Sequence, residues 1–188
     1  MIETARLLLR RWEPRDRAPF ARLNADPEVM AYFPSRLSRA ESDARVALME
    51  EAWAADGIGF AVAERRADGA FIGLVGLSRV RIAAMQDAVE VGWRLGRGHW
   101  GQGYAVEAAR GWLAHGFATM RLAEVVAFTA TGNLRSQAVM RRLGMRRDPG
   151  RDFAHPGLPE GHPLRPHLVF AIDAAGWSAG APSPGPLP

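Results

Sequence analysis

Apolar residues recur with helical spacing early in the chain. Ser38 and Glu41 have the spacing of a capping box, in which serine and glutamate satisfy each other's free backbone donors. They predict a helix that ends at glycines 57–59. Its predicted apolar face consists of Ala44, Leu48, Ala52 and Trp53. Upstream, Asp26 followed by Pro27 predicts another helix start, because proline is favoured at the first helical position.

Two further helices are predicted in the second half of the chain. One follows a glycine-rich stretch and runs to about Thr119. Its expected buried face consists of Ala105, Ala108, Ala109, Trp112 and Leu113. The other spans 133–143 and ends at Gly144, since glycine is the usual residue at the left-handed position after a helix.

Strands are expected between these helices. The predicted strands are 6–12, 60–64, 71–80, 88–95, 124–129, 145–153 and 167–172. Asp68-Gly69 is a hairpin signal between the second and third of them. The order is mixed, with a hairpin meander before the long helix, and it predicts an α/β fold of the α+β kind.

Composition sets the domain organisation. The chain has 188 residues, 48% of them apolar and 23% charged, which is ordinary globular usage and enough for one domain over about 1–177. Residues 178–188 (SAGAPSPGPLP) contain four prolines and no charge, so a disordered tail is expected there.

Charge and cysteine content exclude several function classes. All 24 basic residues are arginines, and they are interleaved with 20 acidic residues, which favours a salt-bridged surface over a nucleic-acid-binding one. The chain has no cysteine, which excludes disulfides, thiolate metal sites and a cysteine nucleophile. No apolar run approaches the ~20 residues that span a bilayer, and charges interrupt residues 1–12. We therefore expect a cytoplasmic protein that binds neither nucleic acid nor membrane.

A glycine-rich loop is the most informative feature. Glycines at 96, 98, 101 and 103 stand between a predicted strand and a predicted helix. Such a loop lets the unpaired N–H groups of the helix start bind a phosphate, although a simple tight turn would look the same. A Walker A loop is excluded because there is no lysine. The spacing over 96–101 (GRGHWG) matches a dinucleotide fingerprint, but Glu124 opens the next strand, where the ribose-binding acid should close it.

Three segments together resemble the GNAT superfamily of acetyl-CoA-dependent N-acyltransferases. They are 4–10 (TARLLLR), 90–93 with 100–108 (EVGW and WGQGYAVEA), and 133–136 with 142–145 (NLRS and RLGM). Within the superfamily, the chain is most similar to the branch of ribosomal-protein N-terminal alanine acetyltransferases. The resemblance covers about 6–172. It implies a largely antiparallel central sheet flanked by helices, with two strands splayed apart at the cofactor site.

The resemblance also implies acetyl-CoA as cosubstrate, without a metal, and assigns residues to it. The implied cofactor-binding residues are Trp93, Arg94, Leu95, Trp100, Gly101, Gln102, Gly103, Tyr104, Ala105, Asn133 and Ser136. Loop amides over 101–105 would hold the pyrophosphate, and the splayed strand at 93–95 would bind the pantetheine arm. Trp100 departs from the family's Gln/Arg position and would pack on adenine or seal the loop. Asn133 has a second interpretation as a helix N-cap.

Two residues are candidates for proton transfer. Glu90 lies on the strand beside the expected thioester, where burial would raise its pKa and make it a base for the acceptor ammonium. The alternative is a structural carboxylate. Ser136 is the candidate donor to the leaving thiolate, because the tyrosine that many relatives use is not evident among Tyr32 and Tyr104. Without a cysteine, we expect direct transfer in a ternary complex.

The acceptor is less defined. A protein N-terminus or a small amine ranks above an aminoglycoside as the acceptor, and a homodimer fits this branch.

The histidines at 155, 162 and 167 match no metal spacing and indicate either a pH-sensitive loop at the acceptor pocket or a surface loop. Phe33 and Trp53 are expected in the core or in the pocket wall. The competing function is a CoA-binding module without catalysis.

Overall fold

The computed structural model describes residues 1–180, and its centre is one nine-stranded sheet. The strands are β1 (Ile2–Glu3), β2 (Leu7–Arg10), β3 (Phe60–Arg65), β4 (Ala70–Arg79), β5 (Val89–Leu95), β6 (Glu124–Ala130), β7 (Arg146–Arg147), β8 (Phe153–Ala154) and β9 (Pro166–Asp173). Their order is β1-β2-β3-β4-β5-β6-β9-β7, and β8 also pairs with β9. Only the β5–β6 pair is parallel among these strands. The predicted α+β class and largely antiparallel sheet are confirmed.

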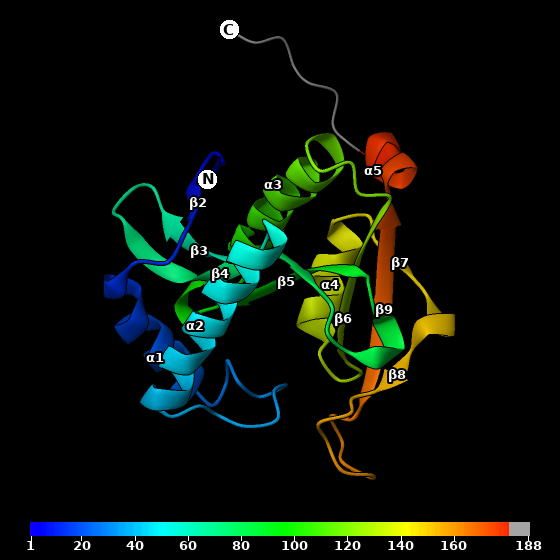
Figure 1. Ribbon diagram of the computed structural model, residues 1–188, viewed down its shortest axis with the longest axis horizontal. Helices are drawn as coiled ribbons and strands as arrows, with labels where there is room; N and C mark the ends of the chain where they lie inside the picture. The colour runs from blue at the N-terminus through cyan, green and yellow to red at the C-terminus, as the bar shows by residue number, and fades with distance from the viewer. Residues whose placement is uncertain (181–188) are drawn as a thin grey trace, which may run out of the picture.

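Helices cover both faces of the sheet (Figure 1). They are α1 (Arg17–Ala25), α2 (Arg39–Asp56), α3 (Tyr104–Ala118), α4 (Leu134–Arg142) and α5 (Ala174–Gly180). Apolar residues of α1 and α2 form one cluster with Val62 and Leu74 of β3 and β4. The larger cluster, on the other face, joins α3 and α4 to neighbouring strand residues such as Ala61 and Val75. No helix within residues 1–180 has the length and hydropathy needed to cross a bilayer.

The capping box at α2 is confirmed, but its predicted apolar face is only partly correct, because Trp53 packs in the core and Leu48 does not. Ser38 accepts from the Glu41 N–H, and the helix ends at Gly57, which has a φ of 72°. Leu48 is 56% exposed, whereas Ser42 and Val46 are buried. The prediction misplaced the buried face of the helix because Ser42, which lies on that face, is polar and was not expected to be buried. Its hydroxyl is satisfied in the interior by the side-chain amide of Asn24, at 2.8 Å.

The predicted helix start at Asp26 is also wrong. A helix that the pattern missed, α1, ends at Ala25, and Asp26 is its C-terminal cap. The carboxylate of Asp26 accepts the backbone N–H groups of Glu28 and Val29 and holds residues 27–32 in turns. An aspartate can satisfy a turn as well as a helix start, so the dipeptide alone did not decide between them.

The C-terminal part differs from the prediction in two places. The strand expected over 145–153 is split into β7 and β8 by a 3-10 turn at Pro149–Arg151, because proline cannot donate to a ladder. Helix α5 continues to Gly180, beyond the predicted end of the folded part at 177. The predicted tail from 181 onward lies outside the described residues. Neither α5 nor the two-residue strand β1 was predicted, and the remaining helices and strands agree with the prediction to within two residues at each end.

Candidate active site

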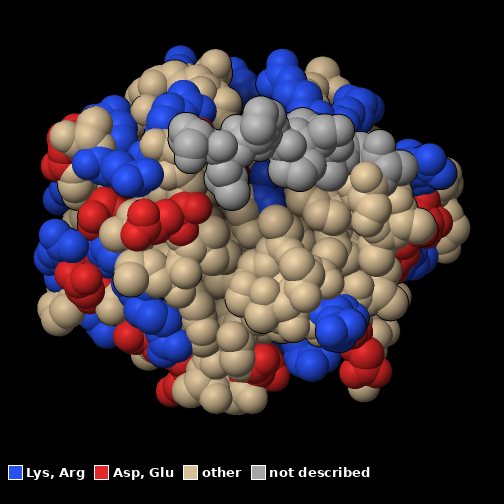
Figure 2. All heavy atoms as spheres, turned by 90° about the horizontal axis from the view of Figure 1, so that it is seen from above, with Lys and Arg blue, Asp and Glu red and all other residues tan. Residues whose placement is uncertain are grey.

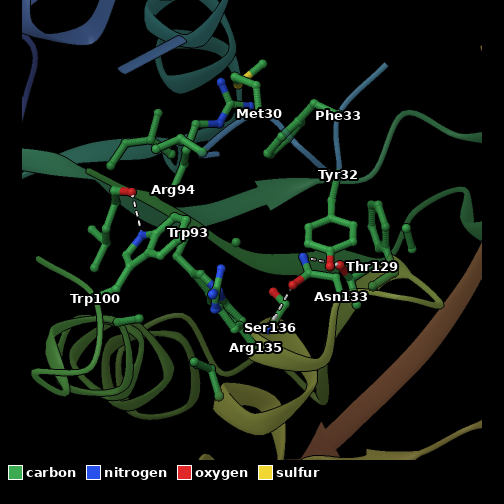
Figure 3. Close-up of a pocket in the computed structure, with 18 of the residues that line it drawn as sticks. Met30, Tyr32, Phe33, Trp93, Arg94, Trp100, Thr129, Asn133, Arg135 and Ser136 are labelled. Atoms are coloured by element: carbon green, nitrogen blue, oxygen red, sulfur yellow. Dashed lines mark hydrogen bonds between the residues drawn. The ribbon is translucent and has the colours of Figure 1, made fainter. Parts of the chain in front are cut away.

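A cavity of about 870 Å³ opens between the two halves of the sheet. Its walls come from the segment between α1 and α2, from β5 and β6, and from the starts of α3 and α4. Figure 3 shows these elements converging around Trp93, Asn133 and Ser136. On the face shown in Figure 2, acidic and basic side chains stand next to one another, and no large area of a single charge is seen there.

The cavity lies where β5 and β6 part. Their pairing is confined to Glu90 and Val126, so the strands diverge beyond that point as expected. The Gly96 N–H donates to Ile72, and the Ala88 carbonyl accepts from Val80. Because backbone groups alternate along an antiparallel strand, the even-numbered residues of β5 face β4 and the odd-numbered ones face the gap. The backbone groups of Trp93 are therefore directed toward the opening.

Trp100 fixes the end of β5 and seals the loop. Its indole N–H donates to the carbonyl of Leu95 at 2.8 Å. The ring lies near the guanidinium groups of Arg97 and Arg135, at 5.4 and 4.8 Å from the ring centroid. The Leu95 carbonyl therefore already has one hydrogen-bond partner, and the contact of 93–95 with a pantetheine arm remains a prediction. These contacts fit the sealing role considered for Trp100, and packing on adenine remains a prediction.

The glycine-rich loop has the geometry that an anion site needs. Gly101 and Gly103 have φ values of 74° and 81°, in the left-handed region that other residues rarely adopt. Gly103 caps α3, and its carbonyl accepts the first intrahelical bond, from Glu107. The N–H groups of residues 104–106 therefore lie in the first turn without intrahelical partners. A Cβ at Gly101 would meet nothing within 4 Å, so the space beside this residue is open, and pyrophosphate binding by these N–H groups remains a prediction.

The N-terminal segment fastens this loop. Arg6 donates from Nε to Glu107 at 2.6 Å and from Nη1 to the Gln102 carbonyl at 3.0 Å. Thr4 donates to the other oxygen of Glu107, also at 2.6 Å. Burial raises the pKa of Glu107, but these hydrogen bonds and the charge of Arg6 outweigh it and leave the pKa below its usual value. This network explains the 4–10 motif physically: it sets the position of the start of α3.

The side chains of three other predicted cofactor residues make contacts within the protein. The Gln102 side chain turns away and donates to the Gly98 carbonyl at 2.8 Å. Tyr104 is 7% exposed and packs in the larger core cluster beneath the Arg6 guanidinium. Ala105 packs against the same cluster and lines the cavity. Contacts of these residues with a cofactor therefore remain a prediction about their N–H groups.

Glu90 is one of the two glutamates that line the cavity. It lines the cavity at the last paired position between β5 and β6. Burial raises its pKa from an ordinary 4.5 to about 7. Within residues 1–180, no hydrogen bond or ion pair of its side chain is found, so the salt-bridged alternative is not supported. A carboxyl group with this pKa exchanges protons readily at neutral pH.

Asn133 is an N-cap, as one of its two interpretations predicted. Its side-chain oxygen accepts from the Ser136 N–H at 3.1 Å, and its amide donates to the Thr129 hydroxyl at 3.0 Å. Ser136 lines the cavity one turn into α4 (Figure 3). Contacts of Asn133 and Ser136 with a cofactor remain predictions.

Arg94 lies elsewhere than expected. Its side chain extends from β5 toward Phe33 and Met30 (Figure 3) and donates to the side-chain oxygen of Asn24 in α1. Its backbone faces β4, since residue 94 is even-numbered and pairs with Leu74. This placement argues against the predicted cofactor contact of Arg94 and puts it on the α1 side of the cavity.

Tyr32 is a cavity residue that the sequence did not assign. Its ring lies over the start of α4, where a Cβ on Gly132 would be 3.6 Å from it. Its hydroxyl end points toward Asn133 and Thr129 (Figure 3). No spacing could have found it, because the 27–37 segment that carries it is far from α4 in the sequence.

The remaining candidates separate into pocket and core. Phe33, His155 and His167 line the cavity, whereas His162 does not. The rings of His155 and His167 are 5.1 Å apart. Burial lowers the pKa of His167, and the nearby His155 lowers it further. Trp53 packs edge-on against Trp112 in the core, at 5.7 Å between ring centroids.

Comparisons with known proteins agree with this geometry. A family model described as an acetyltransferase (GNAT) domain matches residues 6–146. The uncharacterized protein YkkB of Bacillus subtilis is 34% identical over 145 residues, covering 77% of this chain and 84% of YkkB. The FsC-acetyl coenzyme A-N(2)-transacetylase of Aspergillus fumigatus is 34% identical over 152 residues, covering 77% of this chain and 64% of the enzyme.

Solved structures show the same fold. A GNAT-family acetyltransferase from Bacillus anthracis has a TM-score of 0.77 at 24% identity, covering 93% of this chain and 98% of that one. The spermidine N-acetyltransferase of Vibrio cholerae, in complex with CoA and spermine, has a TM-score of 0.71 at 18% identity, covering 92% and 98%. The family-model match spans most of the chain, and the open loop, the splayed strands and the shared fold agree with it. The chain therefore belongs to the GNAT family of acetyltransferases, which transfer the acetyl group of acetyl-CoA.

Proposed function

We propose that this protein transfers the acetyl group of acetyl-CoA directly to a primary amine held in the cavity. The observation that carries the proposal is Glu90, a half-buried carboxyl group with a raised pKa at the point where β5 and β6 part. An alkylammonium has no lone pair, so a base must remove a proton before the nitrogen attacks the thioester. Glu90 is placed to accept that proton.

The surrounding residues bind and orient the two substrates. The N–H groups at the start of α3 hold the pyrophosphate, and the backbone groups of Trp93 bind the pantetheine arm and polarise the thioester carbonyl. The amine nitrogen forms a bond to the carbonyl carbon, and the carbon–sulfur bond breaks. The chain has no cysteine to form an acetyl-enzyme, and this supports direct transfer. The acceptor is a small amine or a protein N-terminus, as in the ribosomal-protein branch.

Ligand-dependent melting and thiol release test this function. Acetyl-CoA and CoA, each at ~100 times its Kd, are expected to stabilise the protein by ~2.7 kcal/mol, roughly 5–10 °C in Tm. ATP, which lacks the pantetheine arm, should shift Tm much less. A panel of primary amines should then release thiol from acetyl-CoA. Binding of CoA with no amine turned over would favour the CoA-binding module, and no shift at all would contradict the loop assignment.

Two hydroxyl groups are candidates for protonating the leaving thiolate. Tyr32 and Ser136 both line the cavity near the N-terminus of α4. A phenol has a pKa near 10, much closer to that of a thiol than a serine hydroxyl is. Tyr32→Phe is therefore expected to lower kcat by ~100-fold, and Ser136→Ala by less. Steady-state kinetics at saturating acetyl-CoA measure both variants, and the opposite ranking would return the role to Ser136.

A further inference from the structure

Arg94 is a buried cation that the proposed chemistry does not use. Its guanidinium lies 3.9 Å from the centroid of the Phe33 ring, inside the cavity wall on the α1 side. Its Nε is buried and has no hydrogen-bond partner among the residues described. A buried positive charge without a negatively charged partner destabilises a fold, so an arginine in this place calls for an explanation.

Among residues 1–180, no acidic side chain forms a salt bridge with Arg94. Burial, together with the smaller effect of the neighbouring positive charge of Arg45, lowers the pKa of Arg94 to about 10. The cavity is lined by two carboxylates, of which Glu28 pairs with Arg97 at 2.6 Å. The other is Glu90, whose raised pKa leaves it partly protonated at neutral pH. The remaining titratable groups that line the cavity are Tyr32, His99, Tyr104, Arg135, Arg142, His155 and His167.

The guanidinium is nevertheless held in a fixed orientation. Its Nη1 donates to the side-chain oxygen of Asn24, whose amide donates to the hydroxyl of Ser42 at 2.8 Å. Asn24 and Ser42 are both fully buried, so α1 and α2 each have a polar residue at an interior position. With Nη1 engaged by Asn24 and Nε enclosed by protein, Nη2 is the donor left to bind a carboxylate in the cavity.

The strand geometry places this cation relative to the base. Glu90 and Arg94 are four residues apart on β5, so their side chains leave the same face with Cα atoms about 13 Å apart. Gly92 lies between them, and Phe60 fills the space above it, since a Cβ there would be 2.8 Å from the ring. The cavity thus offers, in order along one wall, a base, an apolar surface and an arginine.

We propose that the acceptor is an amine that carries a carboxylate several bonds away from its nitrogen, and that Arg94 binds this carboxylate with Arg45 at the rim. This inference rests on the proposed function, because it assigns the acceptor of the same reaction. The amine lies at Glu90, an apolar spacer lies over Gly92 and Phe60, and the carboxylate lies at Arg94. The same charges disfavour polyamines, which would place a second ammonium beside an arginine.

Three acceptors of equal length test the proposal directly. They are 5-aminopentanoate, its neutral amide 5-aminopentanamide, and the diamine 1,5-diaminopentane. We expect kcat/KM for the carboxylate to exceed that for the amide by about 10- to 100-fold, the usual strength of a hydrogen bond to a charged group. An aminoalkyl phosphonate of the same length distinguishes a general oxyanion site from one for carboxylates.

Arg94→Gln keeps a donor for Asn24 but removes the charge. It is expected to abolish the preference for the carboxylate, to leave kcat/KM for the amide within about threefold, and to leave the Kd of CoA unchanged. Arg45→Gln should reduce the preference by a smaller factor. Melting temperatures check folding, and we expect the Tm of Arg94→Gln to equal or exceed that of the wild type, since a costly buried charge is gone.

Binding of unreactive analogues keeps the inference separate from catalysis. Titration of the CoA complex with pentanoate and with pentanamide should show tighter binding of pentanoate, and Arg94→Gln should remove the difference. Equal binding of the two, or an Arg94→Gln variant that loses affinity for CoA instead, would overturn the proposal. If amides and diamines are acetylated as well as the carboxylate, the proposed function stands and this inference fails. If no amine releases thiol, the proposed function fails while the analogue titration still decides the carboxylate site.

Discussion

A Gly103→Val variant is expected to fold and to lose at least ~100-fold in affinity for CoA and acetyl-CoA. Gly103 caps α3 with a φ of 81°, and a β-branched side chain disfavours this conformation strongly. The substitution would shift the loop backbone and add bulk beside the N–H groups that are proposed to hold the pyrophosphate. Loss of two such charged hydrogen bonds accounts for the factor. Isothermal titration with CoA measures it.

Gly69 provides a matched control for backbone strain. It has a φ of 68° in the turn between β3 and β4, and a Cβ there would meet nothing within 4 Å. Gly69→Val should therefore cost roughly 1–2 kcal/mol of stability, a few degrees in Tm, without changing the Kd of CoA. A Gly103→Val protein that folds and binds CoA with wild-type affinity would show that the loop is only a turn.

Replacement of the base has the second large effect. Glu90→Gln is expected to lower kcat by ~10²–10⁴-fold at neutral pH with little change in the Kd of acetyl-CoA, because the amide cannot accept the ammonium proton. In the wild type, kcat should rise tenfold per pH unit below the pKa of about 7 and then level off. The variant should lose this limb, and stopped-time thiol release over pH 5–9 measures both curves.

The free energy of unfolding shows whether the Glu90→Gln variant is folded, and the direction of its change can also be predicted. The folded-state pKa of Glu90 is raised, so between pH 4.5 and 7 the unfolded chain releases a proton that the folded chain retains. The ionised carboxyl group therefore destabilises the fold increasingly as the pH rises through this window, by at most roughly 3 kcal/mol above it. Glu90→Gln should be slower but more stable than the wild type at pH 8.

The control for this variant is Glu124→Gln. Glu124 opens β6, is exposed, and pairs with Arg151 at the surface. Its replacement should leave the pH profile unchanged. If Glu90→Gln retains the wild-type profile, the proton is removed by another group, for which His155 or His167 would be the next candidates.

Much of the site could be predicted because its determinants are local. Gly101 and Gly103 are required by backbone conformation, the Ser38–Glu41 capping box acts within one helical turn, and Gly144 terminates α4 with a φ of 83°. Each depends on neighbours in the sequence, so a spacing is enough to predict it. The position of Glu90 beside the splayed strands was reached through the family resemblance rather than through its own neighbours.

What the sequence could not predict depends on contacts between distant segments. Arg94 was assigned to the cofactor through the family resemblance, as part of the strand at 93–95, but its side chain is held by Asn24, 70 residues away. Tyr32 reaches the start of α4 only in the folded chain. Leu48 was expected to be buried because hydropathy alone cannot show that Ser42 has a partner inside. In each case a polar contact between helices or loops overrode a local pattern.

The strand order also determines when the site can form as the chain is made. The β1–β5 half pairs in sequence order, so it can assemble as soon as residue 95 is available. β6 is different, because its outer neighbour is β9, which ends at Asp173. Until then, β6 exposes an unpaired edge, and the strand end that leads to Asn133 lacks support. The cavity wall formed by β6 and α4 is thus completed last, because β9 is made about 40 residues after β6.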